Sequence, residues 1–291
     1  MSEPLRRSGP TVLQVDAPEQ VQASDEIPTD RRVALRLLWM LDDPNAPLDE
    51  ISRVISTDPA LTVRMLTLAN APYFRTTGDV TALPRAVSVL GTQAVHSIAS
   101  TAVLGLFASD RGELAEDFWL HAITAAVAAA RVAEHVQVDP AEALTAGLLH
   151  DLGEHLLRSR DPQRFDETIR AVSNESDEGR LAIERRIFGV DHATLGAQVL
   201  SRQGVPPAIT NALLDHHLTT ATAAPLTRAV HVADCIAKIV EGDTRVDLDA
   251  TLREAGVAAT GSSLIDQTED DRRAILKFLA AEFLAPRTAR R

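Results

Sequence analysis

Apolar residues recur at three- and four-residue spacing along most of the chain, which is the periodicity of amphipathic helices. Asp58-Pro59 and Asp139-Pro140 add helix-start signals, because aspartate caps a helix N-terminus and proline suits the first turn. No stretch alternates apolar and polar residues as a half-buried strand would, so the predicted fold class is all-α. The pattern predicts helices over residues 30–41, 48–55, 59–70, 84–91, 92–106, 115–136, from 140 to about 151, 164–172, 178–188, 192–202, 207–214, 226–240 and 271–284.

Breaks in this pattern predict the organisation of the chain. Residues 1–28 carry four prolines and few large apolar side chains, so we expect a disordered tail. Asp110 to Glu113 interrupts the helices and is the expected boundary between an N-terminal helical lobe (29–109) and a second helical bundle (113–242). Residues 243–268 are less regular, and we expect 243–291 to form a C-terminal extension that ends in an amphipathic helix.

Composition and charge narrow the classes of function. The net charge of -12 argues against general nucleic-acid binding and against binding to an anionic membrane, since both need a basic surface. The single cysteine, Cys235, excludes an internal disulfide and a CxxC motif. No apolar run reaches transmembrane length, and the first residues lack the apolar core of a signal peptide. We therefore expect a cytoplasmic protein.

Histidines and one aspartate supply the candidate chemistry. Eight of the nine histidines lie between residues 121 and 231, and His150-Asp151 ends an apolar helix. Asp234 lies among apolar residues, where a carboxylate is costly to bury unless it is paired or bound to a cation; the alternative is that it faces solvent or meets an arginine. His135 and His155 are interpreted as surface residues. His96 and His231 are expected to be satisfied or exposed.

Several blocks in order resemble known families. His121, His150-Asp151 and Asp234 resemble the H…HD…D pattern of the HD metal-dependent phosphohydrolase superfamily. The span from about 30 to 242 is similar, more specifically, to the HDOD domain family. The similar blocks are residues 55–62, 68–71, 86–91, 119–121, 146–153 and 189–192, together with Gly196, Pro206 and His216-His217.

The resemblance implies an N-terminal helical lobe packed on an HD-type helical bundle, with a divalent metal (Fe, Mn, Zn or Ni) as possible cofactor. The implied ligands of one ion are His121, His150, Asp151 and Asp234. His192 and one of His216 or His217 could hold a second ion, as in the distantly similar HD-GYP phosphodiesterases, with Asp151 as bridging ligand. Glu154 departs from the lysine usual at its position in HD-GYP proteins, and no Gly-Tyr-Pro follows His217.

The predicted function is that of an HDOD-type signal-transduction or regulatory protein, non-catalytic, acting through a signalling protein partner or a small nucleotide ligand. The groove between the two lobes is the expected binding place. The alternative is a metal-dependent phosphohydrolase or phosphodiesterase acting on a nucleotide or a cyclic dinucleotide such as cyclic di-GMP, in which Asp151 would be catalytic. A DNA-binding regulator is the third class, and no basic stripe supports it. No receiver or GGDEF-type domain is expected beside the HDOD domain.

Overall fold

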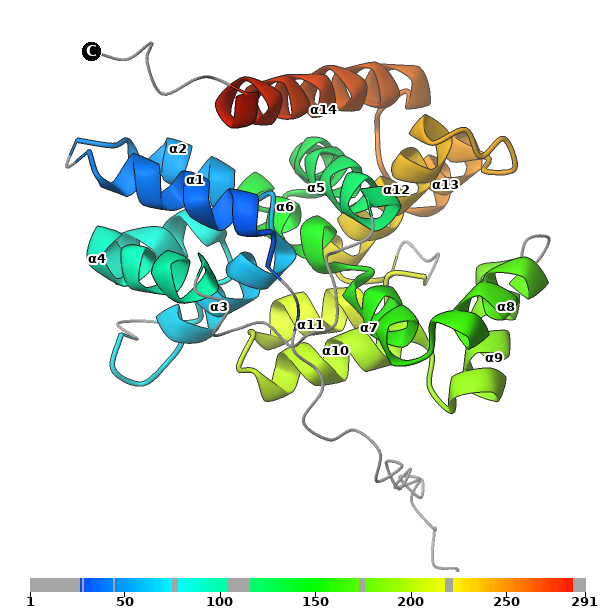
Figure 1. The fold of residues 1–291 in the computed structure, drawn as a ribbon. Coiled ribbons are helices and arrows are strands. Elements are labelled where there is room, and N and C mark those ends of the chain that lie inside the picture. The colour runs from blue at the N-terminus through cyan, green and yellow to red at the C-terminus, as the bar shows by residue number, and fades with distance from the viewer. Residues whose placement is uncertain are drawn as a thin grey trace, which may run out of the picture.

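The computed structural model describes residues 27, 29–43, 45–74, 78–103, 116–172, 176–217 and 222–284, with side chains of the last helix described to residue 277. Every regular element in these ranges is a helix, which confirms the predicted all-α class (Figure 1). None of the described helices combines the length and apolarity needed to cross a membrane. The predicted tail and the 110–113 boundary lie outside the described residues, except Ile27, which is buried.

The first lobe consists of four helices that surround a core of aliphatic side chains. The Asp58 carboxylate accepts a hydrogen bond from the Leu61 N–H at 2.8 Å, so it caps its helix as the Asp-Pro signal predicts. Gly91 interrupts the last helix with a φ of 73°, and this kink separates the two helices predicted over 84–106. The helices are α1 (Arg31–Leu41), α2 (Leu48–Ile55), α3 (Pro59–Ala69) and α4 (Leu83–Val103).

The second lobe is a bundle built around one Ala-rich helix. That helix, α5 (Glu116–Val136), packs along α6 (Pro140–Leu149) and α12 (Pro225–Val240). Small side chains let these three helices approach closely. The other helices of the bundle are α7 (Leu152–Arg160), α8 (Pro162–Val172), α9 (Asp177–Phe188), α10 (His192–Arg202) and α11 (Pro207–Leu214).

Two parts of the helix prediction are incomplete. The apolar pattern predicts a single helix from 140 to about 151 and does not predict α7, which starts one residue after Asp151. The C-terminal region is more regular than expected, because α13 (Leu248–Glu254) lies within it and α14 (Gly261–Leu284) begins ten residues before the predicted start. The first turns of α14 are largely polar, so apolar periodicity did not reveal them.

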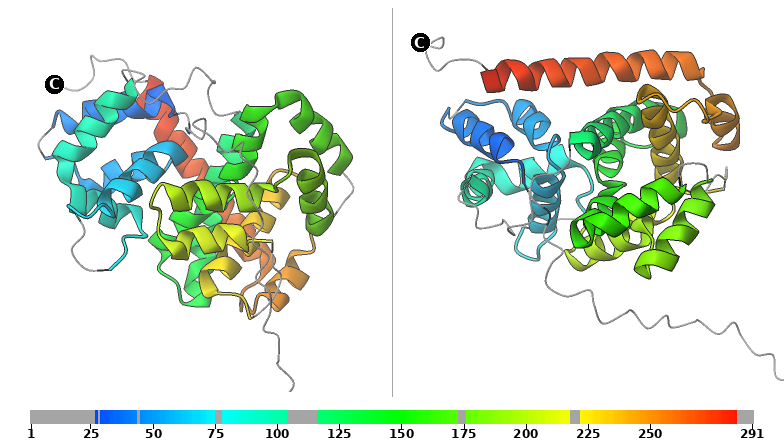
Figure 2. Two further views of the ribbon diagram at one scale, coloured as in Figure 1. Left: turned by 90° about the horizontal axis from the view of Figure 1, so that it is seen from below. Right: turned by 45° about the vertical axis from the view of Figure 1, so that its right-hand side comes forward.

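The two lobes lie side by side, and α14 runs across both (Figures 1 and 2). One continuous cluster of buried side chains extends from α1 to α14. Two hydrogen bonds also join the lobes: Trp119 Nε1 donates to the Thr57 carbonyl at 2.8 Å, and the Leu83 N–H donates to Thr145 Oγ1 at 3.3 Å. An apolar groove of about 450 Å³ lies where α3 and α4 meet the end of α10, beside Ile27.

Candidate metal centre

His150 and Asp151 lie at the break between α6 and α7, which points both side chains into the bundle. Two glycines permit the close helix packing around this break. A Cβ on Gly153 would lie 1.9 Å from the His192 carbonyl oxygen, and one on Gly147 would lie 2.7 Å from a carbonyl oxygen of α5. The glycines of the 146–153 block therefore allow α7 to contact α10 and α6 to contact α5, which brings the histidines of different helices together.

Four side chains form the first cluster, and their donor atoms face one point. His121 Nε2 lies 3.4 Å from His150 Nε2, and 3.5 Å from both Asp151 Oδ2 and Asp234 Oδ1. His150 Nε2 lies 3.3 Å from Asp151 Oδ2 and 3.8 Å from Asp234 Oδ1. Donor atoms about 2.1 Å from a single ion are about 3.0–3.4 Å apart in octahedral or tetrahedral coordination. The spacing therefore suits one cation.

Three more histidines form a second cluster on the other side of Asp151. His192 Nε2 and His216 Nε2 lie 3.5 and 3.4 Å from Asp151 Oδ1, and His217 Nε2 lies 2.9 Å from His192 Nε2. The two oxygens of Asp151 thus face different clusters, as a bridging ligand requires. The sequence assigned one of His216 and His217 to this cluster, whereas the structure brings both to it.

Outer partners orient the imidazoles. His150 Nδ1 lies 2.8 Å from the Gly147 carbonyl oxygen, and His216 Nδ1 lies 2.6 Å from that of Leu213. Each Nδ1 in this geometry carries the proton, which leaves an Nε2 lone pair directed into the centre. Carboxylates do the same for two others, with Glu241 at 3.0 Å from His121 Nδ1 and Glu184 at 2.6 Å from His192 Nδ1. Asp177 lies 3.1 Å from His217 Nδ1 as an ion-pair partner.

The charges around the clusters are unbalanced without a cation. Six carboxylates and two cationic side chains lie around the clusters. If the imidazoles are neutral, four negative charges remain in excess, and two divalent ions would balance them. The carboxylates are those of Asp151, Glu154, Asp177, Glu184, Asp234 and Glu241, and the cations are Arg180 and Lys238. Neighbouring pairs, Arg158–Asp117, Arg185–Asp191 and Arg245–Asp243, are each neutral.

The pKa values respond to this excess of negative charge. Burial opposes a charge on His150, but Asp151 and Asp234 override it and raise the pKa to about 9. The pKa of His121 and that of His192 are raised in the same way, against burial, by the carboxylates beside them. Burial and the neighbouring His217 lower the pKa of His216 to about 3. The metal-free centre therefore binds protons where a cation would otherwise compensate the carboxylates.

The residues present fit a divalent metal. Buried polar atoms normally have hydrogen-bond partners, yet among the described residues His216 Nε2 and Asp234 Oδ1 have none. The Asp234 side chain is only 1% exposed, so the alternative in which it faces solvent is wrong. Imidazole and carboxylate donors together suit the first-row divalent ions. The clusters thus permit a divalent metal, without fixing its identity.

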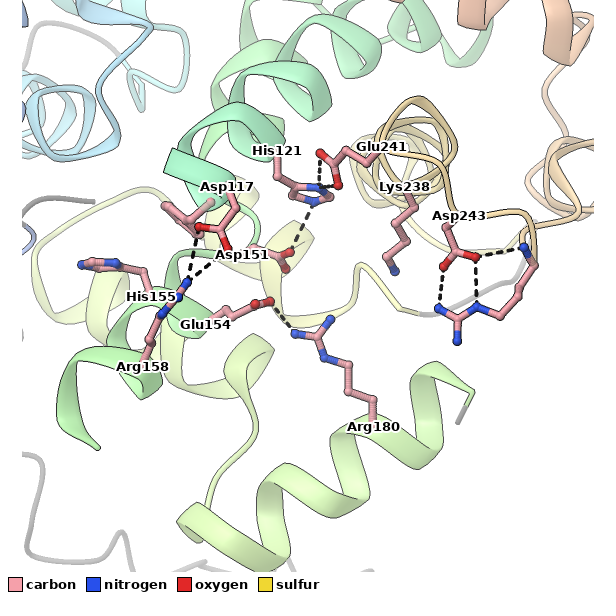
Figure 3. A pocket seen from close by; sticks show the side chains of 12 residues that line it. Asp117, His121, Asp151, Glu154, His155, Arg158, Arg180, Lys238, Glu241 and Asp243 are labelled. Atoms are coloured by element: carbon pink, nitrogen blue, oxygen red, sulfur yellow. Dashed lines mark hydrogen bonds and ion pairs between the residues drawn. The ribbon is translucent and has the colours of Figure 1, made fainter. Parts of the chain in front are cut away.

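A cavity of about 290 Å³ opens above the first cluster (Figure 3). Its cationic side chains are already ion-paired: Lys238 with Asp234, and Arg180 with both Glu154 and Glu184. Arg158 and Arg245, also on the wall, pair with carboxylates as well. Glu154, which the sequence singled out for its sign, is thus neutralised by Arg180 from α9. The cavity wall has no excess of positive charge of its own.

The predicted roles of the remaining histidines hold except at His155. That residue was expected at the surface, but it is 5% exposed and its ring lies 5.4 Å from that of Phe118. Burial, aided by Arg158, lowers its pKa to about 4. His96 and His135 are exposed, as expected. His231 is satisfied, since its Nδ1 lies 2.8 Å from the His216 carbonyl oxygen.

Sequence reasoning missed the residues that surround the ligands. Glu184 is 1% exposed on a helix that otherwise looks polar. Asp177 begins α9, where acids are common, and Glu241 is the residue that ends α12. The available signal was the four-residue spacing of Arg180 with Glu184 and of Asp234 with Lys238. Such pairs are usual on solvated helix faces, so the signal is weak.

The helical bundle thus directs five imidazoles and two carboxylates at two adjoining clusters, an arrangement consistent with an HD-type helical bundle. Residues 27–219 match the HDOD domain model, and the chain belongs to the HDOD family. The response regulator MmoQ from Methylococcus capsulatus str. Bath is 28% identical, with a TM-score of 0.66 over 84% of this chain and 99% of that one. A virulence factor from Campylobacter jejuni subsp. jejuni shares the fold at 16% identity, with a TM-score of 0.63 over 86% and 96% of the two chains.

A relative among curated proteins is an uncharacterized protein from Treponema pallidum (strain Nichols). It is 24% identical over 225 residues, which is 76% of this chain. The chain spans only 44% of the length of that relative.

Proposed function

We propose that this protein is an HDOD-type regulatory protein that holds two divalent ions in its buried centre and acts through binding rather than turnover. The observation that carries the proposal is the arrangement of seven donors in two clusters that share Asp151. The regulatory role is supported by the family and by the response regulator of similar fold. The ligands would be His121, His150, Asp151 and Asp234 for one ion and His192, His216, His217 and Asp151 for the other.

The cavity favours binding over phosphate-ester turnover. Hydrolysis of an anionic ester benefits from side-chain cations that are available to the transferring group. The cations on this wall already compensate carboxylates: Arg180 is held by Glu154 and Glu184, and Lys238 is held by Asp234. An anion entering the cavity would have to break these pairs, so the bound ions would provide the main attraction.

The helix that carries His121 also provides a connection to the first lobe. Trp119, two residues earlier on α5, donates its indole N–H to the Thr57 carbonyl. The neighbouring Asp58 caps α3 and accepts a hydrogen bond from the Asp30 N–H, at the start of α1, at 2.7 Å. If metal binding at the centre shifts α5, the contacts at the junction of α1 and α3 would therefore change. We propose that a signalling protein partner or a small nucleotide ligand binds at this junction, beside the apolar groove, and that its binding depends on whether the centre holds metal.

The test begins with metal content. Protein purified without chelator is analysed for Fe, Mn, Zn and Ni, beside Asp151→Ala and the exposed-site control His135→Ala. We expect two ions per chain in the wild type and in the control, and a loss of both in Asp151→Ala, because Asp151 faces both clusters. Wild-type protein that holds no ion and gains no thermal stability from added divalent ions would refute the proposed centre.

A phosphohydrolase is the second candidate, and the bridging position of Asp151 favours it. Two ions that share a carboxylate can activate water and orient a phosphoryl group. Metal-loaded protein is incubated with cyclic di-GMP and with simple phosphodiesters, and Asp151→Ala serves as the control. Turnover that disappears in the variant would establish the enzyme and refute the non-catalytic proposal, whereas binding without turnover supports it.

A further inference from the structure

Lys238 extends from α12 into the cavity beside the first cluster (Figure 3), and its ammonium group lies between two carboxylates. Its Nζ is 2.8 Å from Asp234 Oδ2 and 3.4 Å from Asp177 Oδ1. Asp234 is one helical turn before Lys238, whereas Asp177 begins α9 and also contacts His217. The ammonium group therefore joins a donor of the first cluster to the carboxylate that pairs with His217 in the second.

These carboxylates form a third group of donors. Ligand atoms of Asp177, His217 and Asp234 all lie within 4.8 Å of one another. The Asp234 side chain is 1% exposed; its Oδ1 has no hydrogen-bond partner among the described residues, and its Oδ2 forms the 2.8 Å ion pair with Lys238. Its Oδ1 faces His121 in the first cluster, so Oδ2 is the oxygen directed at this third position.

We propose that the Lys238 ammonium group occupies a third cation position and thereby limits the centre to two metal ions. The inference rests on the proposed metal centre. A tethered cation at this position places one positive charge between Asp177 and Asp234 without displacing a ligand of either ion. The charge balance agrees with this limit. The six carboxylates exceed Lys238 and Arg180 by four negative charges, which two divalent ions match.

Removal of the ammonium group would leave two carboxylates facing each other across a space that solvent can reach, since the Lys238 side chain is 20% exposed. Paired carboxylate oxygens suit a hard divalent ion, which completes its shell with water. Lys238 thus sets the number of ions, and a neutral residue of similar length would change it.

The experiment measures bound manganese per chain after loading and exhaustive dialysis. We expect two ions in the wild type, three in Lys238→Met, and two in Lys238→Arg, which keeps the charge. Arg245→Met is the matched control, because it removes a cation paired to Asp243 on the same cavity wall but away from the donors. In the double variant Lys238→Met, Asp177→Asn, the count should return to two.

Several outcomes would overturn the inference. They are two ions in Lys238→Met, three in the wild type, or three in the double variant. Lys238→Gln provides a second neutral variant if Lys238→Met does not give a cooperative thermal unfolding transition. A wild type without any ion would instead refute the proposed metal centre itself, so the two failures are distinguishable.

Discussion

Loading the centre with divalent ions at pH 7 should release protons. Imidazole binds a metal in its neutral form, so any histidine that is charged in the metal-free protein must lose a proton first. The carboxylates around His121, His150 and His192 overcome burial and raise the pKa of each of these histidines. These three are therefore the source of the protons.

His150 should release about one proton per chain, and the raised pKa values of His121 and His192 add to that number. The other donors contribute none at pH 7: burial opposes the charge on Asp151 and Asp234, but the cations beside them lower both pKa values, and His216, with a pKa of about 3, is already neutral. Burial also lowers the pKa of His217. Neutralising His150 at pH 7, two units below its pKa of about 9, costs about 3 kcal/mol.

The assay is calorimetric titration of metal-free protein with Mn²⁺ at pH 7 in two buffers of different protonation enthalpy. The difference in apparent enthalpy gives the number of protons released. His135→Ala, at an exposed position, should leave that number unchanged, whereas His150→Ala should lower it by about one. Identical enthalpies in both buffers would show that the histidines are neutral before binding, and would refute the charge reasoning.

The same shift predicts how the stability of the metal-free protein depends on pH. The folded-state pKa of His150, about 9, is above its unfolded value of 6.5, so its contribution is fully present below pH 6.5 and is lost as pH rises through 9. The raised pKa values of His121 and His192 act in the same direction. We therefore expect the urea midpoint of metal-free protein to fall between pH 6.5 and 9.5. The stabilisation by added metal should increase over that window, and a pH-independent difference would contradict this.

Three substitutions test the surroundings of the centre. Gly153→Ala places a Cβ 1.9 Å from a backbone oxygen of α10 and should lower the free energy of unfolding by about 3 kcal/mol or more, measured by urea denaturation; a loss under 1 kcal/mol would contradict the packing. Glu184→Gln weakens the hold on His192 and should reduce the affinity for the second ion about 10- to 100-fold by calorimetry, with the first ion unaffected. Trp119→Phe removes the hydrogen bond to Thr57 and should cost about 1 kcal/mol of stability without changing metal stoichiometry; fewer ions would show that this contact also positions ligands.

The fold was largely predictable because the residues that begin and interrupt its helices act locally. Asp58-Pro59 and Asp139-Pro140 begin helices where the sequence predicted them, and Gly91 marks a kink. The start of α7 has no such signal, since His150 ends α6 with helical dihedral angles and the Asp151 side chain does not cap α7. The break was therefore invisible to periodicity.

The sequence allowed the candidate ligands to be named, but not the residues around them. The histidines and aspartates of the two clusters were named from motifs, and the structure places their donor atoms within reach of one another. Glu184, Arg180 and Lys238 were not named, because their importance depends on how α9 and α12 face α6 and α7. That arrangement is a property of tertiary packing, which no short stretch of this chain encodes.

The ion pair that fastens α14 to α5 has a consequence for how the chain folds. Arg131 donates to both oxygens of Asp271, at 2.6 and 2.9 Å, across 140 residues of sequence. Contacts between such distant segments form late, because the intervening chain must first be ordered. During synthesis, the flank of α5 that α14 covers stays open to solvent until α14 itself has left the ribosome. This flank of α5 is therefore a surface that a nascent chain would need to protect from aggregation.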